Sequence, residues 1–141
     1  MSDGKHIVVT GGAGFIGSHL VERLLAEGRR VVVVDDFSTG CRENLRAVLS
    51  DARLRVIEAK VSACGELPHL AESAEAIYHL AAAVGVELVL NSPVHTLKTN
   101  LHETLAVLDA ASAGAVPVLL ASTSEVYGKS AQAHLTEEDD L

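Results

Sequence analysis

A glycine-rich segment, residues 10–17 (Thr-Gly-Gly-Ala-Gly-Phe-Ile-Gly), directly follows the apolar run 6–9. A buried strand that breaks into glycines and then opens a helix brings bare backbone close to the diphosphate of a dinucleotide. The first turn of such a helix offers unpaired N–H groups and a partial positive charge to the anion. The segment therefore predicts a dinucleotide-binding loop, although a tight strand-to-helix turn without a ligand uses glycines too.

The second apolar run, residues 30–34, ends in Asp35. An acid at the tip of the second strand, about twenty residues after the glycines, can accept hydrogen bonds from the hydroxyls of an adenosine ribose. A turn alone does not require this acid, so Asp35 favours the dinucleotide interpretation. Asp35 and Asp36 would repel a 2′-phosphate, which predicts NAD rather than NADP, and Arg42 is the nearby cation that could compensate.

Strands and helices alternate along the chain. The expected strands cover residues 6–10, 30–35, 54–58, 76–80 and 116–121. The expected helices cover 15–27, 42–50, a short piece near 66–73, and a long helix that starts at Pro93 after the cap Ser92 and stops at Gly114. Right-handed crossovers then give one α/β domain over residues 1–141, a doubly wound parallel sheet of the Rossmann type with order 3-2-1-4-5.

The composition fits this fold. Apolar residues make up 48% of the 141 residues, yet only two Tyr, two Phe and no Trp occur, and aliphatic residues suit a parallel sheet covered on both faces. The net charge of −8 argues against a nucleic-acid or membrane partner. Without a spanning segment or signal-peptide pattern, a cytoplasmic location is expected. Cys41 and Cys64 are expected to be unpaired, and His95 and His102 lack further ligands for a metal site.

In a sheet of this order, the ligand crevice lies at the carboxyl ends of the strands. Two further segments fall at this edge of the predicted sheet. Residues 80–83 (Leu-Ala-Ala-Ala) end the fourth strand, where small side chains leave room for a flat ring, although helix packing would use them equally. Residues 122–128 (Ser-Thr-Ser-Glu-Val-Tyr-Gly) end the fifth strand. Their hydroxyls and carboxylate could bind a polar substrate and move protons, or they could form a serine-rich turn.

These segments, together with Thr99-Asn100, occur in the order and at the intervals of one family. The chain resembles the extended short-chain dehydrogenases/reductases, specifically their nucleotide-sugar epimerases, dehydratases and decarboxylases. The resemblance covers the whole chain. It implies a tightly held NAD that removes a hydride from a sugar carbon and returns it, and a nucleotide-sugar substrate, expected to be a UDP-sugar. A homodimer is expected, because the fifth strand would be a sheet edge and the long helix would keep a bare face.

The resemblance also implies individual roles. Thr123 matches the residue that bonds the reacting sugar hydroxyl, and Ser124 and Glu125 match positions of additional acid–base groups. The implied cofactor-binding residues are Gly11, Gly14, Phe15, Ile16, Gly17, Asp35, Asp36, Ser38, Thr39, Gly40, Lys60, Val61, Leu80, Ala81, Ala82, Ala83 and Asn100.

The chain departs from the family pattern at three places. Lys60-Val61 replaces an Asp followed by Val or Ile, which removes a carboxylate near the adenine amino group but leaves the backbone of Val61. Glu103 replaces a glycine of the long helix. The family's proton-transfer group is a tyrosine with a lysine four residues later, and neither Tyr78 nor Tyr127 is followed by a lysine at that distance. We therefore expect the chain to be the cofactor-binding N-terminal half of such an enzyme, ending before the sixth strand and the sugar-binding domain, and inactive alone.

Three functions remain open. The first is the NAD-binding half of an enzyme resembling UDP-sugar 4-epimerases. The second is a UDP-glucuronate decarboxylase or an NDP-sugar 4,6-dehydratase, because the Thr-Ser-Glu sequence occurs in several of these enzymes. The third is a non-catalytic dinucleotide-binding module. An ordinary reductase with net turnover is less favoured by the Val-Tyr-Gly run and the acids.

Overall fold

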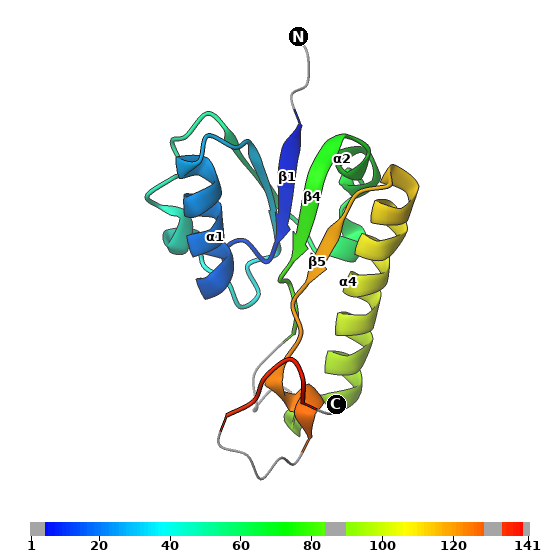
Figure 1. Ribbon diagram of the computed structural model, residues 1–141. Coiled ribbons are helices and arrows are strands. Elements are labelled where there is room, and N and C mark those ends of the chain that lie inside the picture. Colours follow the sequence, from blue (N-terminus) through cyan, green and yellow to red (C-terminus); the bar gives the residue numbers. More distant parts are fainter. Residues whose placement is uncertain (1–4, 84–89, 129–133, 140–141) are drawn as a thin grey trace.

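The computed structural model describes residues 5–83, 90–128 and 134–139 and has a five-stranded parallel sheet at its centre (Figure 1). The strands are β1 (His6–Thr10), β2 (Val31–Asp35), β3 (Leu54–Glu58), β4 (Ala74–His79) and β5 (Val118–Leu120). Their order is β3-β2-β1-β4-β5. The predicted fold class and strand order are confirmed.

Helices cover both faces of the sheet. Helix α1 (Phe15–Ala26) lies on one face, and α2 (Leu67–Ser73) and α4 (Pro93–Gly114) lie on the other (Figure 1). Because side chains alternate along a strand, Ile7 and Val9 of β1 enter the cluster under α1, whereas Val8 enters the cluster under α2 and α4. Two apolar cores therefore hold the sheet from both sides. In the described ranges, no helix combines the length and apolar character that a membrane crossing needs.

The predicted helix over residues 42–50 is wrong. The chain forms a short 3-10 helix, η1 (Arg42–Leu45), and continues in turns to Ser50. Leu45 is buried and Val48 packs partly buried against the same cluster, whereas Leu49 is exposed. Two packed apolar side chains give little support to a longer amphipathic helix. The other elements differ from their expected bounds at the ends, most visibly β5, which covers three residues instead of six.

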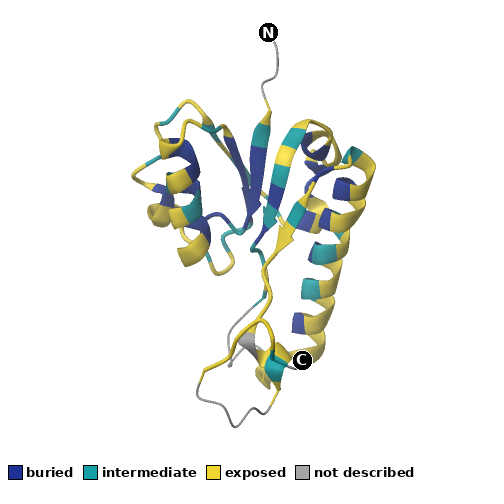
Figure 2. Cartoon of the chain, viewed as in Figure 1, coloured by how far each residue is buried: buried dark blue, intermediate teal, exposed yellow. Residues whose placement is uncertain are grey.

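Helix α4 does not pack on the sheet with its most apolar face. Its buried residues are Thr96, Glu103, Val107, Ala110 and Ala111. The helix also carries an apolar stripe at helical spacing, and this stripe is exposed, as is much of the outward face of α4 (Figure 2). The residues of the stripe are Val94, Leu97, Leu101, Leu105 and Leu108. Small residues allow this close packing. A Cβ at Gly114, for example, would lie 2.7 Å from the backbone oxygen of Ala71 in α2.

A buried polar network joins β1, β4 and α4. His79 is only 3% exposed. Its Nδ1 lies 2.7 Å from the Thr10 hydroxyl and its Nε2 lies 3.2 Å from the Thr104 hydroxyl. The Thr10 hydroxyl accepts a hydrogen bond from the Ala81 N–H, so we assign its own proton to Nδ1. His79 is then neutral and donates from Nε2 to Thr104.

Burial lowers the pKa of His79, and the nearby charge of Glu103 opposes this only in part. The unfolded chain takes up the proton near the ordinary value of 6.5, whereas the folded chain takes it up only at lower pH. Acidification below that value therefore favours the unfolded state.

We expect the free energy of unfolding to fall between about pH 7.5 and about pH 5.5, and to fall less in His79→Asn than in the wild type. Urea denaturation at the two pH values measures this difference. His102→Asn, which changes an exposed histidine of α4, serves as the control and should behave like the wild type. Equal losses in the wild type and His79→Asn would contradict the assignment.

Candidate functional site

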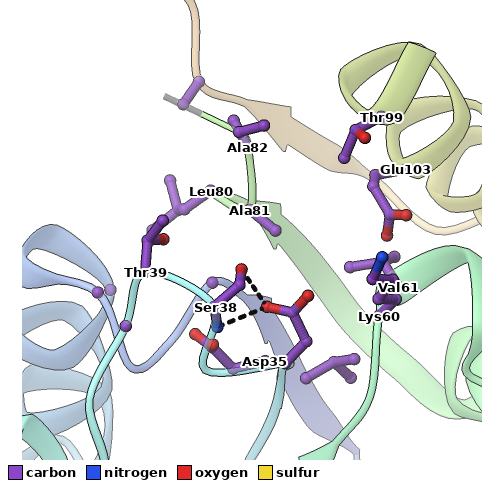
Figure 3. Close-up of a pocket in the computed structure, with 18 of the residues that line it drawn as sticks. Asp35, Ser38, Thr39, Lys60, Val61, Leu80, Ala81, Ala82, Thr99 and Glu103 are labelled. Atoms are coloured by element: carbon purple, nitrogen blue, oxygen red, sulfur yellow. Dashed lines mark hydrogen bonds between the residues drawn. The ribbon is translucent and has the colours of Figure 1, made fainter. Parts of the chain in front are cut away.

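A cavity of about 460 Å³ lies at the carboxyl ends of the strands, between the glycine loop, the turn after β2 and the N-terminal half of α4. This volume is in the range of small-molecule sites. Figure 3 shows its wall, with Ser38 and Thr39 facing Leu80, Ala81 and Ala82 across the opening. The cavity therefore occupies the position predicted for the ligand crevice of a doubly wound sheet.

The structure places sixteen of the seventeen predicted cofactor residues in the wall of this one cavity; Asn100 is the exception. The lining residues among them are Gly11, Gly14, Phe15, Ile16, Gly17, Asp35, Asp36, Ser38, Thr39, Gly40, Lys60, Val61, Leu80, Ala81, Ala82 and Ala83. Their contacts with a bound cofactor stay a prediction.

The glycines of the loop serve different purposes. Gly11 has a φ of +70°, and a Cβ there would meet the backbone N of Ala81 at 2.7 Å. A Cβ at Gly17 would lie 2.2 Å from the backbone oxygen of Gly11, so only glycine lets α1 pack this close to the loop. Gly14 has an ordinary φ of −74°, and its nearest neighbour, the oxygen of Gly11, is 3.3 Å from a built Cβ. Gly14 therefore leaves cavity space that a methyl group would occupy.

Gly14 is also the N-cap of α1, and no side chain caps the helix there. The first N–H groups of α1 have no acceptor inside the helix and open toward this end of the cavity. An anion at the glycine loop would gain these hydrogen bonds and the favourable helix dipole. The loop thus fits a diphosphate, through backbone donors and the space beside Gly14.

The Asp35 carboxylate lies in the cavity wall beside the glycine loop, at the end of β2. It is 7% exposed, and its two oxygens accept hydrogen bonds from the backbone N–H of Ala13 and of Phe37, both at 2.8 Å. Each oxygen keeps a further lone pair, so the carboxylate can still accept from a ribose hydroxyl. Asp35 is therefore both a link between two loops and an acceptor in the cavity wall.

Asp36 adds a second negative charge. Burial raises its pKa, but hydrogen bonds from the Ser38 hydroxyl and N–H and the charge of Lys60 together outweigh burial, so the pKa of Asp36 is lowered. Arg42, the cation considered for a 2′-phosphate, is already engaged. Its guanidinium donates to Glu58 at 2.6 Å and lies 4.6 Å from the centre of the Phe37 ring.

Asn100 of α4 is bonded to Ala83, a residue of the cavity wall. Its side chain accepts from the Ala83 N–H at 2.6 Å and donates to the Ala83 carbonyl at 3.1 Å. These two bonds tie the segment after β4 to α4. Asn100 is outside the set of lining residues, and its two bonds hold Ala83, which belongs to that set. A direct contact of Asn100 with a cofactor stays a prediction.

Two of the predicted catalytic residues, Thr123 and Glu125, are not among the residues that line the cavity. Thr123 caps the 3-10 helix η3 (Ser124–Tyr127), and its hydroxyl accepts from the Glu125 N–H at 3.3 Å. Thr123 and Glu125 are exposed. Ala121, two residues before Thr123, is in the cavity wall. Thr123 and Glu125 therefore lie just after β5, at the same end of the sheet as the cavity, and their catalytic roles stay a prediction. The Ser124 side chain lies outside the described part of the structure.

Sequence reasoning missed several lining residues, above all Thr99 and Glu103 of α4. Their spacing of four residues places them on one face of the helix. The signal was therefore present, but the leucine stripe on another face dominates the pattern. In the described part of the chain, no group of three His, Cys, Asp or Glu residues could hold a metal ion.

The different surroundings of Gly14 and Gly17 lead to a prediction. Gly14→Ala should change the free energy of unfolding by less than about 1 kcal/mol but weaken NAD binding by about tenfold or more, because the methyl group enters the diphosphate space. Gly17→Ala should cost about 2 kcal/mol of stability, because the methyl group overlaps the Gly11 carbonyl. Urea denaturation and titration calorimetry measure both effects. Unchanged NAD affinity in Gly14→Ala would place the diphosphate elsewhere.

Several known proteins are similar to the chain. It is 46% identical over 122 residues to UDP-glucuronic acid decarboxylase 1 of Arabidopsis thaliana, and 39% identical over 137 residues to UDP-glucuronic acid decarboxylase 1 of Danio rerio. Among solved structures, a dTDP-glucose 4,6-dehydratase from Streptomyces venezuelae with NAD bound has a TM-score of 0.88 at 35% identity. A UDP-N-acetylglucosamine 4-epimerase from Methanobrevibacter ruminantium has a TM-score of 0.87 at 29% identity.

These matches cover most of this chain but a smaller part of the relatives. The alignments include 86% and 97% of the chain, yet 27% and 31% of the two decarboxylases. The two solved structures match 96% and 98% of the chain and 45% and 44% of their own lengths. The chain thus spans less than half of the proteins that it resembles.

The family assignment extends along nearly the whole chain. The family model described as the NAD dependent epimerase/dehydratase family matches residues 7–141. This agrees with the resemblance inferred from the glycine loop, Asp35 and the Val-Tyr-Gly run, and it confirms NAD as the cofactor of the family. The chain belongs to the NAD-dependent epimerase/dehydratase family.

Proposed function

We propose that this chain binds NAD and forms the cofactor-binding part of an enzyme that oxidises a UDP-sugar transiently. The observation that carries the proposal is the single cavity that unites the glycine loop, the start of α1 and the Asp35 carboxylate. The relatives named above support the substrate class, because they act on nucleotide sugars or are solved with NAD.

Each part of the cavity has a defined task in this proposal. Backbone N–H groups in the first turn of α1 bind the diphosphate, and Asp35 accepts from the adenosine ribose. NAD, when bound, supplies a hydride acceptor that becomes a hydride donor for the return step. Asp35 and Asp36, next to the ribose, disfavour the negative charge of a 2′-phosphate. Arg42 is paired with Glu58 and so is not available to neutralise that charge. The chain should therefore prefer NAD to NADP.

Among the possible reactions, decarboxylation of a UDP-linked uronic acid has the most support. The relatives with 39 to 46% identity described above are UDP-glucuronic acid decarboxylases. In this reaction Thr123 would bond the sugar hydroxyl at the reacting carbon, and Ser124 and Glu125 would assist proton transfer. A 4-epimerase is the second candidate, supported by the solved epimerase of the same fold.

We expect the product of the complete gene to release CO₂ from UDP-glucuronic acid without net accumulation of NADH, and the present chain alone to bind NAD without turnover. Thr123→Val should lower the rate by about a hundredfold, because it removes the hydroxyl but keeps the shape. Thr136→Val, at an exposed position elsewhere, should leave the rate unchanged.

Interconversion of UDP-glucose and UDP-galactose in place of CO₂ release would favour the epimerase, and NAD binding without either reaction would favour a non-catalytic module.

We further propose a homodimer formed through the outer face of α4. Five apolar side chains at helical spacing are between 44% and 70% exposed along this helix. They are Val94, Leu97, Leu101, Leu105 and Leu108. Such a continuous apolar stripe is rare on a monomer, and a two-fold contact between identical helices would bury it on both copies at once.

Light scattering of the wild-type chain should therefore give the mass of a dimer. The double variant Leu101→Lys/Leu105→Lys should give the mass of a monomer, because two charges on each helix would be buried without partners. Leu49→Lys is the matched control, since Leu49 is 47% exposed but lies outside α4. A wild-type chain that stays monomeric at high protein concentration would contradict the proposed interface.

The proposed setting is the cytoplasm, with neither nucleic acid nor membrane as a partner. The net charge of −8 supports this, because both partners attract basic surfaces. Cys41 and Cys64 are free thiols, which suits a reducing compartment.

A further inference from the structure

Glu103 is a buried acid in a place where the mechanism above assigns no charge. Its residue exposure is 7%, and it belongs to the cavity wall. Burying a carboxylate is costly unless hydrogen bonds compensate for the lost water. Ser62 provides two such bonds: its backbone N–H donates to Oε2 at 2.9 Å and its hydroxyl donates to Oε1 at 2.6 Å. The two residues are 41 positions apart in the chain.

The segment that Glu103 holds is the turn after β3. This turn leads through Lys60 into the 3-10 helix η2 (Val61–Ala63). Figure 3 shows Glu103 reaching from α4 toward Lys60 and Val61. A three-residue 3-10 helix has little intrinsic stability, and its first N–H groups have no acceptor within the helix. Glu103 therefore supplies, from another element, the cap that η2 lacks.

The position of this turn decides which part of a dinucleotide it would meet. Strand β3 pairs with β2 so that Glu58 lies opposite Asp35, and the Ala59 N–H donates to the Asp35 carbonyl at 3.1 Å. The turn after β3 thus lies next to the residue proposed to bind the adenosine ribose, on the side away from the glycine loop. A base attached to that ribose would lie against Lys60 and Val61.

We propose that Glu103 is a positioning residue for the cofactor base. Its bonds to Ser62 fix the turn after β3, so that the wall formed by Lys60 and Val61 presents backbone donors and acceptors to the edge of the purine at a set position. This inference rests on the proposed binding of NAD. It assigns a task to a buried carboxylate that the proposed reaction does not use.

The test compares NAD with nicotinamide hypoxanthine dinucleotide, which differs only at the edge of the purine. Replacing the amino group of adenine by oxygen inverts the hydrogen-bonding pattern of that edge. We expect the wild-type chain to bind NAD about tenfold more tightly than the hypoxanthine analogue, the size of one good pair of hydrogen bonds to a base. In Glu103→Ala this ratio should fall to about twofold, because the turn is no longer fixed.

Two further variants separate positioning from charge. Glu103→Gln keeps an acceptor for the Ser62 N–H and can donate to the Ser62 hydroxyl, so it should retain the wild-type ratio. Ser62→Ala keeps the backbone bond but loses the hydroxyl, and it should give an intermediate ratio even if Glu103→Ala does not fold. His102→Ala, an exposed neighbour on α4, is the matched control.

The ratio of the two dissociation constants is measured by titration calorimetry. It is insensitive to partial unfolding, because unfolding lowers the apparent affinity for both dinucleotides by the same factor. A wild-type chain without a preference, or a folded Glu103→Ala chain with the full wild-type preference, would overturn the role of Glu103. A wild-type chain that binds neither ligand would instead overturn the proposed NAD binding itself.

Discussion

The cavity depends on the two hydrogen bonds that the Asp35 carboxylate accepts from backbone. One comes from Ala13 in the glycine loop and the other from Phe37 in the turn after β2. The second bond is made while Phe37 has a φ of +56°, a left-handed conformation that is unfavourable for a bulky residue. Because every residue of β2 is buried, the carboxylate is held on a rigid strand. One side chain thus fixes the glycine loop and the turn after β2 relative to each other.

Much of the fold could be predicted because its signals are local. Consecutive apolar residues such as 31–34 mark a strand buried on both faces, and the glycines that follow β1 fix where the first helix begins. The segment after Cys41 could not be predicted in the same way. Its residues permit a helix, but only packing decides whether one forms, and the segment is anchored by buried Leu45, half-buried Val48 and the bond from Asn44 to the Ala13 carbonyl. Likewise, the stripe of leucines on α4 does not reveal which face meets the sheet.

The candidate site also has parts that the sequence predicts and parts that it does not. The glycine loop, Asp35 and the turn at Ser38 could be predicted because they are contiguous motifs with a known geometric reason. The bond between Ser62 and Glu103, and the contact of His79 with Thr10, join residues that lie 41 and 69 positions apart. Such pairs leave no mark in a single sequence. The roles of Thr123 and Glu125 rest on the family motif, and both residues are exposed in the described structure.

The first turn of α1 carries two apolar side chains at the mouth of the cavity. Phe15 is 78% exposed and Ile16 is 70% exposed, and both belong to the cavity wall. A molecule that fills the cavity removes part of this surface from water and releases the water that covered it. Such association carries a negative change in heat capacity. Its enthalpy therefore becomes more favourable with each rise in temperature, even where a compensating loss of entropy leaves the affinity almost constant.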